Sequence, residues 1–250
     1  MKEFPHKLSA SGWDLANPKK YPLTGFSGTN DSQHVLPISV TQLGLASQTH
    51  TNALVLCRLM RPENSVVSLA EMGLRGICKS RELLGLITKM DPEVRVVLDV
   101  GALVLDMTNE QFAHEWLKIT EGRDDIQAIV FCSSNDDLDR CVVFLDEAHT
   151  RGIDLRMPSN YRAAVSLGAN LTKDRLIQAC MRMRKLGVGQ SVVFCMPEEI
   201  ETKVRAMATN TNGRPMSVED VLEWAIRGTW ADLRRSMPLW LKQGKSFARL

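Results

Sequence analysis

The sequence of 250 residues contains no GxxxxGK(S/T) loop, the glycine-rich turn that cradles nucleotide phosphates in P-loop NTPases. None of its six cysteines stands in a CxxC pair, which argues against a zinc ribbon and leaves no metal site to predict. No stretch of about 18 apolar residues is present, so we expect no membrane partner. Residues 1–14 lack the apolar core of a signal peptide, and the expected location is therefore cytoplasmic or nuclear.

An excess of charge of one sign is also missing. The chain has 31 Lys and Arg against 29 Asp and Glu, a net charge of +2, so any basic site must be local. The composition leaves nucleic-acid binding undecided. Hydrophobic residues make up 44% of the chain, which is enough for an ordinary globular core. Cysteines within apolar runs are expected to be buried, reduced thiols: Cys57, Cys132, Cys141 and Cys195.

Short apolar runs alternate with helical patterns along most of the chain. Five runs are nearly continuous in apolar residues, as expected for strands buried on both faces. They are residues 94–100, 127–132, 141–146, 162–167 and 190–195. Residues 35–40 are a weaker candidate, because Pro37 would interrupt a central strand. The alternation predicts an α/β fold with a mostly parallel sheet and helices on both faces.

The spacing of apolar residues also predicts the helices between these strands. They cover residues 52–60, 78–90, 109–119, 171–186 and 197–209. Asn109 is expected to cap the third helix and Gly187 to stop the fourth. Residues 217–242 predict two amphipathic helices divided near Gly228, with Ser217 and Asp220 as a capping pair.

Three regions follow from these patterns. Residues 1–34 are rich in Pro, Gly, Ser, Asn and Lys and predict an irregular lead-in. Residues 35–196 hold the alternating strands and helices. Residues 197–250 are helical only, which predicts a C-terminal helical appendage.

The most informative stretch is CVVFLDEAHTRGIDLR, residues 141–156. A buried strand delivers Asp146, Glu147 and His149 to its carboxyl end, where open α/β sheets bind their ligands. The DEAH string alone is weak evidence for a magnesium site. Without a phosphate-binding loop in the chain, we do not expect this segment to hold magnesium by itself.

Three short motifs resemble those of superfamily 2 helicases and the preprotein-translocase ATPase, in the same order along the chain. Residues Thr24–Thr29 (TGFSGT) are similar to the motif that couples the two lobes; the residues that match are Ser27, Gly28 and Thr29. Residues Thr150–Leu155 (TRGIDL) resemble the RGxD motif of the second lobe, which implies nucleotide contacts by Gly152 and Asp154.

The third motif, starting at Gln178, resembles the Q-x-x-x-R-x-x-R motif whose Gln and arginines reach the phosphates. Arg182 and Arg184 are the arginine candidates, and Lys185 stands where the motif has its second arginine. The resemblance implies that residues 35–196 are a RecA-like second lobe contributing half an ATP site. ATP and magnesium would bind only together with a missing first lobe, and no cofactor would bind the chain alone.

Each motif also has a plainer interpretation. Residues 146–154 could be a polar loop at a sheet edge. Arg175, Arg182, Arg184 and Lys185 could form a solvated helix face. The SGTND string of residues 27–31 could be a turn.

Longer strings resemble a second, more specific family. It comprises very large fungal and other eukaryotic proteins that are labelled ubiquitinyl hydrolases. The strings are SGWDL, TGFSGTND, LDVGA, FLDEAHTRG and LTKDRLIQACMRMRKLGVGQSVVFC. The resemblance covers about residues 10–205 and implies that the chain is a fragment of such a protein.

The label implies a thiol deubiquitinase with ubiquitin as partner. Cys180 would be the nucleophile, His149 the base and Asp146 the orienting group, with Arg182 and Arg184 favouring the thiolate. The sequence therefore leaves three functions open: half an ATP site, a thiol hydrolase, or a degenerate RecA-like module used for interaction.

Overall fold

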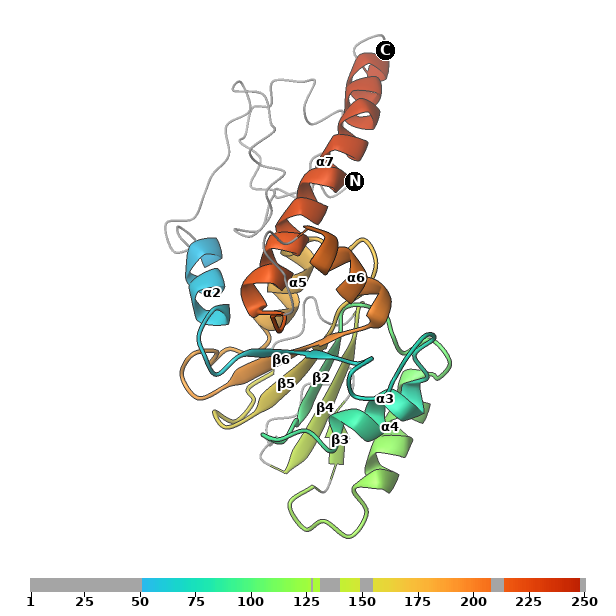
Figure 1. Ribbon diagram of the computed structural model, residues 1–250, viewed down its shortest axis with the longest axis vertical. Helices are drawn as coiled ribbons and strands as arrows, with labels where there is room; N and C mark the ends of the chain where they lie inside the picture. Colours follow the sequence, from blue (N-terminus) through green and yellow to red (C-terminus); the bar gives the residue numbers. More distant parts are fainter. Residues whose placement is uncertain (1–50, 127, 131–139, 149–154, 208–213, 248–250) are drawn as a thin grey trace, which may run out of the picture.

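The computed structural model describes residues 51–126, 128–130, 140–148, 155–207 and 214–247. They form an α/β fold built on a six-stranded, all-parallel sheet with the strand order β1-β6-β5-β2-β4-β3, and they end in a long helix (Figure 1). The strands are β1 (Ser65–Ser68), β2 (Val96–Asp99), β3 (Ala128–Val130), β4 (Cys141–Asp146), β5 (Arg162–Ser166) and β6 (Ser191–Met196). The helices are α2 (Thr51–Leu59), α3 (Ser80–Ile87), α4 (Asn109–Ile119), α5 (Lys173–Cys180), α6 (Glu198–Met207) and α7 (Val218–Phe247).

All five strongly apolar runs contain strands, as the sequence predicts. β4 has the predicted ends, and the ends of the other four strands differ from the predicted ones by at most two residues. Four consecutive residues of β2 and five of β4 are buried, because helices cover both faces of these central strands. β1 is a strand that the apolar pattern did not predict. It has only four residues, two of them serines, and it pairs with β6 alone at the edge of the sheet. The weak candidate at residues 35–40 lies outside the described residues.

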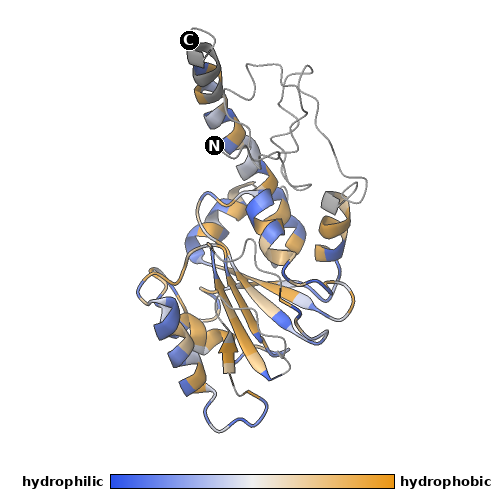
Figure 2. Ribbon diagram, turned by 180° about the vertical axis from the view of Figure 1, so that it is seen from behind, coloured by the Kyte–Doolittle hydropathy of each residue, from blue (hydrophilic) through white to orange (hydrophobic). Residues whose placement is uncertain are grey.

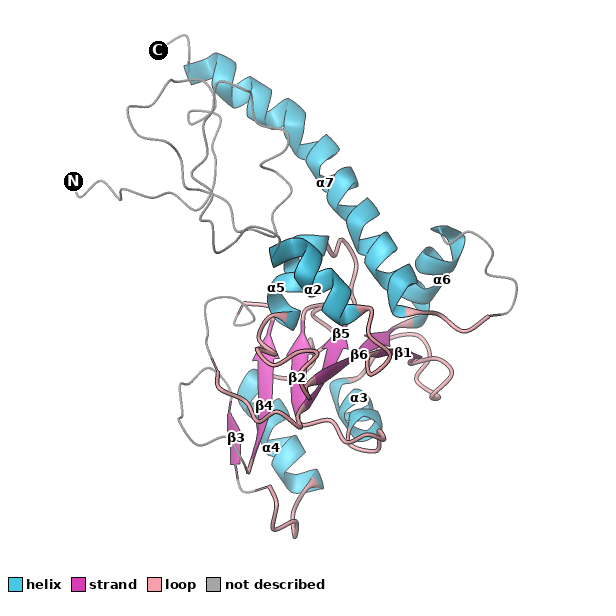
Figure 3. Cartoon of the chain, turned by 90° about the vertical axis from the view of Figure 1, so that its left-hand side faces the viewer, coloured by secondary structure: helices cyan, strands magenta, loops and turns pink. Residues whose placement is uncertain are grey.

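The sheet separates two apolar clusters. One face packs against α3 and α4 through large side chains such as Leu84, Phe112 and Trp116. The other face packs against α2, α5, α6 and the first half of α7. The two groups of helices lie on opposite sides of the sheet (Figure 3), and the strands between them are the most hydrophobic part of the chain (Figure 2). Because Ile200, Val204 and Val221 belong to the second cluster, the helical C-terminal region is continuous with the α/β core.

The predicted break near Gly228 is wrong, since α7 runs unbroken through this residue. A Cβ atom at Gly228 would lie 2.6 Å from the backbone oxygen of Leu171, so this glycine allows close packing instead of ending a helix. The capping pair at the start of α7 is confirmed. The Ser217 N–H donates to Asp220 Oδ2 (2.8 Å), and the Asp220 N–H donates to Ser217 Oγ (3.3 Å).

The cap of α4 and the end of α5 also differ from the prediction. The cap of α4 is Thr108, whose hydroxyl accepts from the Gln111 N–H while Gln111 caps in return; Asn109 is the first helical residue. The α5 helix ends at Cys180, well before Gly187, and the chain continues in turns to Gln190. Within the described part of the chain, no helix is long and apolar enough to cross a membrane.

Candidate functional site

Between β2 and β5, the chain changes the direction in which it adds strands to the sheet. After β2 the chain moves to β3 and β4 on one side of the sheet, and after β5 it moves to β6 on the other. When the segments that follow two adjacent strands run to opposite sides of the sheet, they leave a crevice at the carboxyl ends of these strands. This crevice is the usual ligand position in open α/β sheets. The first candidate site is therefore the region beyond Asp99 and Ser166.

The loops that follow β2 and β5 are fixed to each other at this crevice. The buried Asp99 carboxylate accepts hydrogen bonds from the N–H groups of Leu103 (2.9 Å) and Val104 (3.0 Å) and from the Ser166 hydroxyl (2.6 Å). The Gly101 N–H in turn donates to Ser166 Oγ (2.8 Å). This network shapes the VGALV segment that follows β2.

Two glycines bring the loop backbones into contact. A Cβ atom at Gly168 would lie 2.1 Å from the Gly101 oxygen, and one at Gly101 would lie 2.5 Å from the Leu167 carbonyl carbon. No side chain fits between the loops at either position. The bottom of the crevice is thus closed by backbone, and any ligand must bind above it.

A cavity of about 590 Å³ lies above this floor, over the carboxyl ends of β6, β5 and β2. Its lining comes from four separate segments: Gly76, Ile77, Cys78, Gly101, Leu103, Leu167, Gly168, Ala169, Pro197, Glu198, Glu199, Ile200 and Thr202. Of the described residues that line it, two are glutamates and none is basic, and Glu198 Oε2 accepts the Gly76 N–H (3.3 Å). Such a surface repels phosphate, so this cavity does not suit a nucleotide's phosphates.

Cys78 is the one thiol that lines this cavity. Burial, followed by the negative charges of Asp99, Asp106 and Glu82, raises its pKa to about 11. The thiol is therefore protonated near neutral pH. These surroundings are the reverse of the electropositive ones that activate a nucleophilic cysteine.

A second polar cluster lies at the end of β4, on the other side of β2. Asp146 Oδ2 accepts a hydrogen bond from Asn109 Nδ2 at the start of α4 (2.7 Å). Glu147 Oε1 forms an ion pair with Arg175 Nη2 in the first turn of α5 (2.6 Å). The structure therefore brings together two segments that the sequence singles out, the one after β4 and the helix after β5.

The predicted phosphate-contacting residues lie at the opposite end of α5 and beyond it. Gln178 Nε2 donates to Asp174 Oδ1 (3.0 Å), and Arg182 Nε donates to the Gln178 carbonyl (3.4 Å). Arg184 and Lys185 are exposed in the turns after the helix. Arg182 and Arg184 have further interactions within the molecule.

The predicted nucleophile Cys180 is the last residue of α5 and is fully buried in the larger apolar cluster. Burial raises the pKa of its thiol to about 12, so the thiolate is not formed near neutral pH. Asp146, the predicted orienting group, accepts a hydrogen bond from Asn109. These features are typical of a structural thiol.

The other predicted site residues lie outside the described residues and stay predictions. They are His149, Gly152 and Asp154 of the segment after β4, and Ser27, Gly28 and Thr29 of the coupling-motif candidate. Of the cysteines expected to be buried, Cys141 and Cys195 are buried. Cys57 is exposed, so the expectation for it was wrong, and Cys132 is outside the described part.

Among the described residues, no group of three or more His, Cys, Asp or Glu side chains could hold a metal ion.

Comparisons with known proteins add no relative. No protein-family profile, no curated protein and no solved structure matches the chain. Fold and site thus define the class only as an α/β protein with a six-stranded parallel sheet and a long C-terminal helix.

Proposed function

We propose that this chain is a RecA-like second lobe of a helicase-type NTPase, which contributes half of a nucleotide site and depends on a partner lobe for the other half. The observation that carries the proposal is the Glu147–Arg175 ion pair of 2.6 Å. It joins the segment that leads into the RGxD-like motif to the helix that leads into the arginine motif. In a second lobe these two motifs act on the same nucleotide.

The chemistry of the residues supports this assignment. An arginine that stabilises a transferring phosphoryl group needs a planar, permanently charged head, and Arg182 would supply one from the turn after α5, at the opposite end of this helix from the Glu147–Arg175 pair. Asp154 would take the ribose or orient the arginine segment. The polar cluster at the end of β4 is a better nucleotide position than the acidic cavity, because no described residue that lines the cavity carries a positive charge to offset that of the phosphates.

The phosphate cradle is absent from the sequence, so the chain alone should hydrolyse no ATP. The half-site leads us to expect weak ATP binding, whereas the sequence alone predicts that no nucleotide would bind without the first lobe. The test is titration of the purified chain with a fluorescent, ribose-labelled ATP analogue, together with a magnesium-dependent ATPase assay. We expect weak, saturable binding that Arg182→Ala reduces several-fold. The matched control is Arg81→Ala, which removes an arginine from α3 on the other face of the sheet.

Saturable binding that Arg182→Ala and Arg81→Ala reduce equally would contradict the proposal. Magnesium-dependent ATP turnover by the chain alone would contradict it as well. If no analogue binds at all, the degenerate interaction module becomes the better account.

The resemblance to large proteins labelled ubiquitinyl hydrolases is part of the proposal at the level of the whole protein. The lobe would then be one segment of such a protein, with ubiquitin recognised elsewhere in it. The burial of Cys180 and its pKa of about 12 argue against placing the thiol chemistry in this segment.

A further inference from the structure

The second half of α7 extends away from the α/β core (Figures 1 and 3). Its first half is anchored by buried residues, the last of which is Leu233. Beyond this point, the described side chains up to Lys242 are exposed, apart from the half-buried Ser236. A helix of 30 residues is about 45 Å long, so a substantial length of it lies beyond the core.

Large apolar side chains are exposed on this extension and in the helical turn just before it. Trp230 is 53% exposed, Met237 41% and Leu241 62%. Their spacing of seven and four residues places all three on one face of a helix with about 3.6 residues per turn. Leu239 is also exposed (59%) and, by the same geometry, lies on the opposite face.

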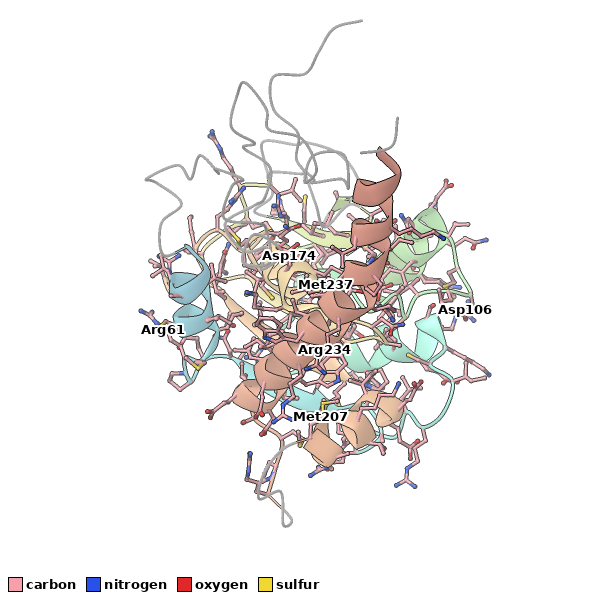
Figure 4. All side chains as sticks on the ribbon, turned by 90° about the horizontal axis from the view of Figure 1, so that it is seen from above. Arg61, Asp106, Asp174, Met207, Arg234 and Met237 are labelled. Carbon is pink, nitrogen blue, oxygen red and sulfur yellow. The ribbon has the colours of Figure 1, made fainter. Side chains whose placement is uncertain are left out.

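The charged residues of the extension are all basic. Residues 234–247 contain four basic residues, among them Arg234 and Lys242, and no Asp or Glu. Arg235 is paired with Asp232 of the preceding turn (2.6 Å). Arg234, which Figure 4 shows on α7 near Met237, has no ion-pair partner among the described residues, and neither has Lys242. The extension is thus a basic amphipathic helix.

Such a helix is poorly stabilised by itself. Most helical stability in proteins comes from tertiary packing, and here Pro238 also removes one backbone donor from the helix interior. A partner that covers the exposed apolar side chains would supply the missing packing.

The charges and the two apolar faces limit what that partner can be. A second copy of the chain would bring a second basic helix, and the like charges would repel. A flat lipid surface would cover Trp230, Met237 and Leu241 but leave Leu239 in water. A groove that encloses the helix can cover both faces, and acidic side chains on its rim would pair with Arg234 and Lys242.

We propose that residues 230–242 of α7 are a docking helix for a protein partner with an apolar groove rimmed by acidic side chains. This role is independent of nucleotide binding. It uses a surface of the helix that lies beyond the core and contributes nothing to the polar cluster at the end of β4.

The test uses calcium-loaded calmodulin as the probe, because it is an acidic protein whose groove of methionines encloses basic amphipathic helices. Calorimetric titration of the whole chain should give a one-to-one complex with a dissociation constant of about 10 µM or tighter, lost when calcium is chelated. Trp230→Ala and the pair Arg234→Glu with Lys242→Glu should each weaken binding at least about tenfold. The matched control is Leu105→Ala, which removes a more exposed leucine that lies away from α7.

Circular dichroism of each variant shows whether the fold is retained before the affinities are compared. Absence of binding by the folded wild-type chain would overturn the proposal. Binding that none of the α7 variants weakens would overturn it too. Co-sedimentation with phosphatidylcholine vesicles containing phosphatidylserine, without calmodulin binding, would overturn it in favour of a lipid surface.

Discussion

Glu147 and Arg175 form an ion pair of 2.6 Å that links the end of β4 to the first turn of α5. The residues are 28 positions apart in the sequence, and β5 lies between them in the chain. Both side chains are partly exposed, so the pair contributes little stability, about 0–1 kcal/mol. The pair matters for the position of the two segments, because it holds the end of β4 and the first turn of α5 close enough to contact one ligand.

Because the backbones of the two crevice loops are in contact, we expect one added methyl group between them to lower the stability of the fold sharply. Gly168→Ala should destabilise the fold by about 3 kcal/mol or more, because its Cβ atom would overlap the Gly101 oxygen at 2.1 Å. Urea unfolding measures the change. The matched control is Gly85→Ala in α3, where nothing lies within 4 Å and the better helix propensity should add up to about 1 kcal/mol. Equal effects of the two substitutions would disprove the close approach.

Gly228 is also a helical glycine, but its replacement by alanine should have the opposite effect on stability to that of Gly85→Ala. Helix propensity favours Gly228→Ala by about 1 kcal/mol, whereas the new Cβ atom would meet the Leu171 oxygen at 2.6 Å. We expect the clash to dominate, with a net loss of about 1–2 kcal/mol in the free energy of unfolding. A stabilised variant in the same urea assay would show that α7 does not pack this closely.

Because two thiols are buried, we expect the free energy of unfolding to fall at alkaline pH. Burial raises the pKa of Cys180 and of Cys195 from 9.0 to about 12. Each thiol favours the folded state below pH 9, where it is protonated in both states. Above that pH the unfolded chain loses the proton first, so stability falls by about 1.4 kcal/mol per pH unit and thiol.

Urea unfolding under reducing conditions between pH 8 and pH 11 tests this slope. Cys180→Ala should make the slope shallower, although it also lowers stability at every pH by leaving a small cavity. The control is Cys57→Ala, which removes an exposed thiol. An unchanged slope in Cys180→Ala would mean that this thiol is accessible to hydroxide in the folded protein.

The buried position of Cys180 also predicts the outcome of a deubiquitinase assay. A ubiquitin probe with a cysteine-reactive C-terminus should form no adduct with the folded chain, as read by intact mass. Attack needs an accessible thiolate, and Cys180 is fully buried and protonated near neutral pH. A ubiquitin-sized adduct that disappears in Cys180→Ala would refute this and restore the thiol-hydrolase hypothesis for this segment.

The core of the sheet was predictable from sequence because burial on both faces leaves a continuous apolar run. β1 was not, because an edge strand with Ser65 and Ser68 buries too little to show such a run. The role of Gly228 was not predictable either. A glycine that ends a helix and one that admits a neighbouring backbone look the same in sequence, and the difference depends on Leu171, 57 residues away.

The candidate sites were predictable only in part. The segment after β4 stands out because a polar string follows an apolar strand at once. The acidic cavity gives no comparable signal, since Cys78, Gly101, Gly168 and Glu198 come from four separate segments that only the strand order assembles. Asp99 stands within the LDVGA string, but its three hydrogen bonds depend on how the next loop folds back and on the distant Ser166.

The position of bound nucleotide is the most direct test of a half-site at the end of β4. The purified chain would be photolabelled with 8-azido-ATP and the modified peptides mapped by mass spectrometry, with excess ATP as competitor. We expect labelling within residues 141–156 or 174–187 that excess ATP suppresses, and none in peptides that line the acidic cavity. Labelling at residues 76–78 or 197–202 instead would contradict it and place the nucleotide in that cavity.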